Sequence, residues 1–273
     1  MPLAVCATPI GNLEDVTLRV LGELRDADVV LCEDTRVTRG LLERHGIKAR
    51  LLSYHEHNEA KRTAELLPRL EAGERMALVT DAGLPGVSDP GARLIAAALD
   101  AGVPVTVLPG ASSVDTALVL SGLGAERFQF VGFLPRGERA LRELWDELAR
   151  WPHAVVAFES PQRLPRTLRS LASAMPERPV AVARELTKFY EEVVRGSAEE
   201  VAGRFSEPPK GEVVLVLGPW EGAGAAAAGP LDETAAAEAV AALVAEGVAR
   251  RRAAEVVSRL TGVSRNALYD RSL

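Results

Sequence analysis

Short apolar runs alternate with stretches of helical spacing through the first 121 residues, and this alternation restricts the fold more than any other feature. Strands that alternate with helices at this interval predict a parallel sheet joined by helical crossovers. The predicted strands are residues 3–7, 29–32, 51–54, 76–80 and 103–108, and the predicted helices are residues 16–25, 38–45, 58–71, 93–101 and 114–121. We therefore expect a parallel-sheet α/β domain over residues 1–118.

Segments rich in glycine, proline or polar residues follow all five predicted strands. The carboxyl ends of parallel strands meet at one edge of a sheet, and ligands gather there. The longest of these segments, residues 80–91, holds three glycines, two prolines, Asp81 and Asp89, and no basic residue. Its backbone can approach a ligand closely, and the lack of a lysine favours a neutral or cationic ligand over a nucleoside triphosphate. Local chemistry alone equally allows a tight loop with capping aspartates.

The pattern changes after residue 124, and we interpret the strands and helices that follow as a second α/β domain with a mixed sheet over residues 119–219. Its predicted strands are residues 128–133, 154–158, 180–184, 191–195 and 213–217, and its predicted helices are residues 139–150, 163–174 and 198–205. Charged clusters stand beside three of these strand ends, at residues 158–163, 183–188 and 210–212. Three such clusters at one edge favour a ligand cleft between the two domains.

The C-terminal part begins with a Gly/Ala-rich segment, residues 220–231, that is typical of a flexible linker. Residues 232–273 are expected to form a small helical domain, with helices at residues 233–245, 250–260 and 264–272 in a helix-turn-helix-like spacing. The whole chain carries a net charge of −6, yet residues 250–273 hold six arginines against two acidic residues. The overall charge argues against a general nucleic-acid coat protein, while the tail keeps a local basic face.

Several function classes lose their sequence support. The chain has no phosphate-binding loop, no dinucleotide-binding fingerprint, no paired C-x-x-C and no H-E-x-x-H. His55 and His57 form a lone H-x-H without a companion cluster, so no metal is predicted. No apolar run approaches the length of a membrane span, no secretion signal is evident, and Cys6 and Cys32 lie in strand-like runs, so we expect a cytoplasmic protein with reduced thiols.

Six motifs, in order, resemble those of the small-subunit ribosomal RNA 2'-O-methyltransferase I family, within the tetrapyrrole-methylase-like superfamily. They are residues 8–12, 33–36, 80–91, 158–160, 183–188 and 210–212. The resemblance runs from about residue 3 to residue 217, and residues 261–269 are similar to the family's C-terminal appendage. The chain departs from the family pattern at Leu84, at Gly86 and Val87, and at the end of the final strand.

The resemblance implies a homodimer that binds S-adenosyl-L-methionine between its domains and methylates a cytidine ribose 2'-hydroxyl in the decoding region of 16S rRNA. On this interpretation the cofactor is held by Pro9, Asp81, Ala82, Gly83, Leu84, Pro85, Ser112, Ser113, Phe158, Gly211 and Glu212. The predicted RNA-binding residues are Asn12, Arg36, Arg184, Arg250, Arg251, Arg252 and Arg265.

Methyl transfer depends mainly on positioning the hydroxyl against the methyl group, with help in removing the hydroxyl proton. The predicted catalytic residues are Glu185 and Lys188, the latter as a base only if its surroundings lower its pKa.

Two other functions stay open at this stage. One is methylation of a porphyrin or corrin ring, although residues 8–12 lack the G-x-G-x-G-D loop typical of that branch and a tetrapyrrole enzyme has no evident need for a basic tail. The other is a ribosome-assembly factor that keeps the fold without catalysis, against which Asp81, Glu185 and Lys188 argue. A fold hosts many substrates, so the site has to discriminate.

Overall fold

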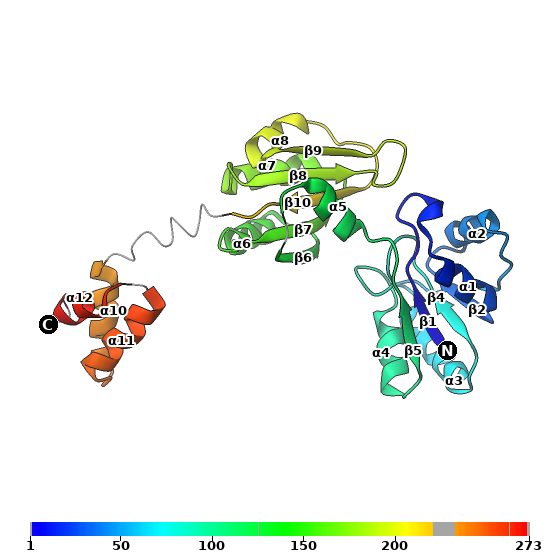
Figure 1. Ribbon diagram of the computed structural model, residues 1–273, viewed down its shortest axis with the longest axis horizontal. Coiled ribbons are helices and arrows are strands. Elements are labelled where there is room, and N and C mark those ends of the chain that lie inside the picture. Colours follow the sequence, from blue (N-terminus) through cyan, green and yellow to red (C-terminus); the bar gives the residue numbers. More distant parts are fainter. Residues whose placement is uncertain (1, 125, 221–232, 262, 272–273) are drawn as a thin grey trace.

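The computed structural model describes residues 2–124, 126–220, 233–261 and 263–271. Its first sheet is wholly parallel, in the order β3-β2-β4-β1-β5 (Figure 1). The strands are β1 (Leu3–Cys6), β2 (Val29–Cys32), β3 (Leu51–Ser53), β4 (Met76–Leu78) and β5 (Val105–Leu108). The parallel sheet predicted from strand and helix alternation is therefore confirmed.

Both faces of this sheet are buried, which explains why its strands are apolar runs without alternation. Leu3 and Val5 face one core with α3 (Glu59–Glu71) and α4 (Ala92–Asp100). Ala4 and Cys6 face the other core, which α1 (Leu18–Asp26) and α2 (Thr35–Arg44) cover. The short 3-10 helix η1 (Leu13–Asp15) follows β1. Because all five strands of this sheet run parallel, their carboxyl ends lie along a single edge of it.

The second sheet is mixed, in the order β6-β7-β10-β8-β9, and only β6 and β7 run parallel. The strands are β6 (Phe128–Phe133), β7 (Ala154–Glu159), β8 (Pro179–Arg184), β9 (Glu192–Ser197) and β10 (Val213–Leu217). This confirms the mixed sheet predicted for the second part of the chain.

Helices cover both faces of the second sheet. One face packs against α6 (Glu138–Leu148), α7 (Leu164–Ala174) and α8 (Ala198–Arg204). The other face packs against α5 (Ser113–Ser121), whose Ala117 and Leu118 join the core of β7, β8 and β10. The boundary predicted after residue 118 thus falls inside a helix that packs on the second sheet, and the division into domains stays a prediction.

The helices α10 (Glu233–Ala245), α11 (Arg250–Thr261) and α12 (Arg265–Arg271) share a small apolar core of their own. The predicted helices at the C-terminus are therefore present in this part of the chain. The predicted linker at 220–231 lies outside the described residues except for Trp220. No helix that the structure describes combines the length and apolarity needed to cross a membrane.

Arg178 is the one cation buried completely among the described residues, and it joins three parts of the second domain. Its guanidinium donates to the carbonyls of Gly218 at 3.1 Å, Leu148 at 2.7 Å and His153 at 3.1 Å. Desolvation lowers the pKa of Arg178 to about 10, so it stays charged near neutral pH. The guanidinium therefore supplies hydrogen bonds to backbone carbonyls that have no partner in the β-sheet.

We expect Arg178→Met to lower the free energy of unfolding by about 2–4 kcal/mol, because it leaves buried carbonyls without donors. Arg169→Met, at an exposed position on α7, is the matched control and should change it by less than about 0.5 kcal/mol. Chemical denaturation of both variants measures the difference. Equal stability of Arg178→Met and the wild type would contradict the bracing role.

Candidate functional site

Three loops at the carboxyl edge of the first sheet are held together by hydrogen bonds. The Thr8 amide donates to the Gly83 carbonyl at 2.8 Å, and the Gly83 amide donates back at 3.1 Å. The Thr8 hydroxyl donates to the Thr80 carbonyl at 3.0 Å, and the Asp34 amide donates to Asp81 Oδ1 at 3.0 Å. The loops after β1, β2 and β4 therefore form one connected surface.

Glycines allow these loops to pack closely. A side chain at Gly110 would place its Cβ 2.9 Å from the Cβ of Ala7, so the loop after β5 lies directly against the end of β1. Gly83 has a φ of 79°, in the left-handed region that favours glycine. Ser112 caps α5 by accepting from the Asp115 amide at 3.3 Å, and Ser113 is the first residue of that helix. The capping role considered for Ser112 is thus present.

Carboxylates concentrate negative charge at this edge. Desolvation, together with the charges of Glu33 and Asp81, raises the pKa of Asp89 to about 6. Desolvation also raises the pKa values of Glu33 and Asp81, and repulsion adds to it, from Asp81 at Glu33 and from Asp34 at Asp81. Arg36 acts in the opposite sense on Asp34, whose pKa it lowers to about 2 through hydrogen bonds. The surface therefore holds more negative charge than its own cations balance, which suits a cationic ligand.

The second domain contributes an ion-paired cluster from the loops that follow β8 and precede β10. Lys188 Nζ lies 2.9 Å from Glu185 Oε1 and 2.8 Å from Glu212 Oε2. Burial pulls the pKa of Lys188 down, but hydrogen bonds and charge from Glu212 and Glu185 outweigh it and leave the pKa raised. The hydrogen bond from Lys188 lowers the pKa of Glu185. Lys188 therefore fails the condition set from sequence for acting as a neutral base.

The loop that carries this cluster is strained. Glu185 and Thr187 have φ values of 51° and 63°, which are unusual for residues with side chains. Gly211 has a φ of 87°, and a Cβ there would lie 2.3 Å from the Glu185 carboxyl group. Such strain persists only where the surroundings fix it, and it marks this loop as a functional candidate.

The same loop contacts the first domain at Gly11. A Cβ at Gly11 would lie 2.6 Å from the Leu186 carbonyl and 2.7 Å from both Lys188 Cγ and Thr187 Oγ1. The Asn12 amide donates to Thr187 Oγ1 at 3.0 Å. Beneath this contact, an apolar cluster joins Ile10 of the first domain to Leu186 of the second. The charged loop and the acidic edge are therefore held at one junction.

The remaining predicted residues divide between this junction and the rest of the chain. Phe158 packs into the same apolar cluster, with ring centroids 4.8 Å from Phe130 and 5.4 Å from Phe133. Arg184 is paired with Glu192 at 2.5 Å beside the charged loop. The buried Pro9 and the 82–85 segment belong to the connected loops of the first domain. The tail arginines Arg250, Arg251, Arg252 and Arg265 lie on α11 and α12.

Two residues of the candidate site were not predicted from the sequence. Glu33 adds charge beside Asp81 and Asp89, and Thr187 joins the two domains. Both lie inside the motifs quoted above, so their position was available from sequence, but burial and cross-domain contacts were not. Within the described ranges, no three His, Cys, Asp or Glu side chains are arranged to hold a metal ion.

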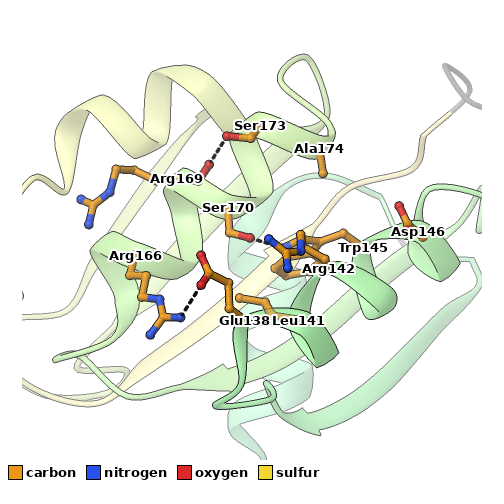
Figure 2. A pocket seen from close by; sticks show the side chains of 10 residues that line it. All are labelled: Glu138, Leu141, Arg142, Trp145, Asp146, Arg166, Arg169, Ser170, Ser173 and Ala174. Atoms are coloured by element: carbon orange, nitrogen blue, oxygen red, sulfur yellow. Dashed lines mark hydrogen bonds and ion pairs between the residues drawn. The ribbon is translucent and has the colours of Figure 1, made fainter.

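A hollow of about 480 Å³ lies elsewhere, on the outer face of α6 and α7 (Figure 2). Trp145 forms part of its wall and donates to Ser170 Oγ at 3.0 Å, while Arg166 pairs with Glu138 at 3.6 Å. None of the residues that line it is a predicted site residue. The helices that form it cover the face of the second sheet opposite α5, so we place the candidate site at the interdomain junction.

Comparison with known proteins identifies the family to which the chain is similar. The family model of the Tetrapyrrole (Corrin/Porphyrin) Methylases matches residues 2–202. A protein of Mesorhizobium japonicum named ribosomal RNA small subunit methyltransferase I is 42% identical over 99% of this chain and 91% of its own length. A Thermotoga maritima protein of the same name is 44% identical over 79% of this chain and 97% of its own length. The match to the Thermotoga protein therefore leaves about a fifth of this chain unaligned.

Solved structures share the fold. Uroporphyrin-III C-methyl transferase of Thermus thermophilus, complexed with S-adenosylhomocysteine, matches with a TM-score of 0.56 at 24% identity, covering 79% of this chain and 96% of that one. Diphthine synthase matches with a TM-score of 0.60 at 18% identity, covering 79% of this chain and 89% of that one. At these identities the likeness concerns architecture alone.

We expect Gly11→Ala to disturb the junction, because the added Cβ overlaps the Leu186 carbonyl and the Thr187 hydroxyl. Overpacking of this kind costs about 1–3 kcal/mol in the free energy of unfolding. Hydrogen exchange at the Asn12 amide should also become faster. Gly40→Ala in α2 is the control, since nothing lies within 4 Å of its added Cβ, and it should stabilise the helix slightly. If both variants had the same stability and the same exchange rate at the Asn12 amide, the contact between Gly11 and residues 186–188 would be contradicted.

The raised pKa of Asp89 predicts a pH-dependent effect of Asp89→Asn. The folded pKa of about 6 exceeds the ordinary 3.8, so ionised Asp89 destabilises the fold at neutral pH, and this cost disappears as pH falls below the ordinary value. Asp89→Asn should therefore be more stable than the wild type at pH 7.5, with the difference shrinking through pH 6 toward pH 4. Denaturant unfolding at a series of pH values measures this. A difference that does not vary with pH would contradict it.

Proposed function

Since the chain belongs to the ribosomal RNA small subunit methyltransferase I family, within the tetrapyrrole methylases, we propose that it methylates small-subunit rRNA. The proposed reaction is transfer of a methyl group from S-adenosylmethionine to the ribose 2'-hydroxyl of a cytidine in the decoding region. The observation that carries the proposal is the match over nearly the whole chain to relatives of that name, at 42% identity in the Mesorhizobium protein. The motifs that carry the resemblance gather at one junction between the two sheets.

The first-domain edge fits the cofactor on chemical grounds. S-adenosylmethionine is a cation that supplies, when bound, a methyl group activated by its sulfonium. The uncompensated negative charge of Asp81, Asp89 and Glu33 suits such a ligand, and the glycine-containing loops expose backbone amides and carbonyls to it. The residues proposed to hold it are Pro9, Asp81, Ala82, Gly83, Leu84, Pro85, Ser112, Ser113, Phe158, Gly211 and Glu212.

The charged loop of the second domain is proposed to handle the proton of the ribose hydroxyl. Glu185 is proposed to accept the proton, because it is a carboxylate on the strained loop and Lys188 is held as an ammonium ion by Glu185 and Glu212. An ammonium group has three hydrogens, and Glu185 and Glu212 each take one. The third suits the ribose oxygen, which gains negative charge as its proton leaves. Lys188 is thus assigned to charge stabilisation, which replaces the role as a base.

Contacts with RNA are proposed at two places. Asn12, Arg36 and Arg184 lie around the junction, where Arg36 and Arg184 are paired with acidic residues and can exchange those partners for phosphates. Arg250, Arg251, Arg252 and Arg265 give the tail its positive charge. Because the tail has a core of its own and its positive charge suits phosphates, we assign it an auxiliary part in RNA affinity. A homodimer and a cytoplasmic location stay predictions.

Tetrapyrrole methylation is the second candidate, because the matching family model bears that name. Identity decides between the two, since the rRNA relatives share 42–44% of residues while the uroporphyrin enzyme shares 24%. Mass mapping of ribose methylation in small subunits, from cells with and without the protein, tests the proposal directly. Loss of one 2'-O-methyl group without the protein is the expected result, and an unchanged map would remove the proposed function.

We expect Glu185→Gln to slow single-turnover methylation about 10²-fold or more, which is the usual size of a proton-transfer contribution. Lys188→Met should slow it as well, because the ammonium charge is lost and two carboxylates are left facing each other. Lys61→Met, at an exposed position on α3 away from the junction, is the matched control and should keep a rate close to that of the wild type. Near-wild-type rates in both Glu185→Gln and Lys188→Met would contradict a side-chain role in proton removal.

A further inference from the structure

Phe189 and Tyr190 are displayed to solvent at the tip of the loop that joins β8 and β9. They are 94% and 70% exposed, and Phe189 has the highest exposed fraction of any large hydrophobic residue that the structure describes. Their ring centroids lie 5.0 Å apart at an interplanar angle of 89°. Exposed aromatic pairs of this kind contribute nothing to a core, so they point to a binding surface.

The loop that carries the two rings is braced from several sides. The Thr187 amide donates to Glu191 Oε2 at 2.7 Å, and the Glu191 amide donates to the Lys188 carbonyl at 3.1 Å. Leu186 anchors the loop in the apolar cluster of the second sheet. The aromatic rings are therefore presented on a backbone that is already ordered, which lowers the entropy cost of binding.

The position of the loop ties the rings to the candidate site. Figure 1 shows it projecting from the second sheet on the side of the first domain, and residues 186–188 contact Gly11 there. Phe189 directly follows Lys188, whose ammonium lies between Glu185 and Glu212. The two rings therefore belong to the same loop as the charged cluster and the contact with Gly11.

We propose that Phe189 and Tyr190 form a stacking platform for an unpaired base of single-stranded RNA next to the methylated nucleotide. The proposal rests on the proposed function, which it extends by naming positioning residues for the RNA. Sequence-specific RNA-binding proteins act mostly on unpaired nucleotides, whose base faces stack on aromatic side chains.

A second copy of the chain is a poorer occupant for this surface. Two aromatic side chains offer roughly 150–250 Å² each, well below the ~800 Å² per partner of a stable interface. The rings are surrounded in the loop by Lys188, Glu191 and Glu192, and charged residues are depleted in interface cores. A single base, by contrast, needs only one exposed ring face and tolerates charged neighbours.

The test compares two ligands of equal length, a labelled oligocytidylate and its abasic counterpart, which has the same phosphates without bases. Wild-type protein should bind the oligocytidylate roughly five- to hundredfold more tightly, the usual range for loss of one aromatic stack. The double variant Phe189→Ala/Tyr190→Ala should lose this preference while keeping its affinity for the abasic strand. Replacing both rings with Trp should retain the preference, since an indole also stacks.

Three controls separate stacking from other effects. Leu18→Ala, at a position 86% exposed on α1, should leave both affinities unchanged. The salt dependence of binding should be unaltered in the aromatic variant, whereas replacing Arg250, Arg251 and Arg252 with Ala should make it shallower. In steady-state methylation of small subunits, the aromatic variant should raise KM for RNA and leave binding of S-adenosylmethionine, measured by calorimetry, unchanged.

Each remaining outcome overturns the proposal. Equal loss of affinity for both strands would show a structural role for the rings, and a shift from dimer to monomer in sedimentation would show a self-association surface. If wild-type protein methylates small subunits but binds the oligocytidylate and the abasic strand equally well, the stacking proposal is wrong and the proposed function stands. Wild-type protein that neither binds nor methylates small-subunit RNA would remove the proposed function as well.

Discussion

The contact between Gly11 and residues 186–188 is the constraint on which the rest of the site depends. A backbone without a side chain at this position lets the loop after β1 lie against a strained loop of the other domain. The apolar cluster beneath it fixes the separation of the two sheets, because Ile10 and Leu186 are both almost fully buried there. The acidic edge and the ion-paired cluster would otherwise be unrelated features of separate domains.

The two halves of the junction carry opposite electrostatic characters. At the first-domain edge, carboxylates outnumber the cations beside them, and desolvation together with the charges of Glu33 and Asp81 raises the pKa of Asp89 to about 6. In the second domain, Lys188 is ion-paired with Glu185 and Glu212, and the pKa values of Lys188 and Glu185 both move toward full ionisation. Carboxylates without direct ion-pair partners attract a cationic ligand, whereas an ion-paired cluster holds its charged groups in fixed positions. This difference is why we assign the cofactor to the first and the hydroxyl proton to the second.

Sequence patterns predicted the sheets well because burial on both faces leaves a plain signal. Runs such as residues 29–32 and 213–217 match the observed strands residue for residue, and the turns between strands were marked by glycine and proline. The assignment of α5 was not available in the same way, since its apolar residues fit either sheet and only packing decides which one Ala117 and Leu118 contact. Long-range placement of a helix is set by tertiary contacts, and local spacing does not encode it.

The chemistry of the charged loop shows the same limit more sharply. The motif at residues 183–188 predicted a site, but the sequence does not show which of its acidic and basic residues form ion pairs. Only the fold brings Glu212, from the loop before β10, to 2.8 Å between its Oε2 and Lys188 Nζ, and that pairing changes the lysine from a conceivable base into a fixed cation. A positive charge held in place needs no reorganisation when negative charge develops beside it, and this preorganisation is the main electrostatic advantage of a folded site over water. The strain at Glu185 and Thr187 is then understood as the conformational cost of holding that cation at the junction.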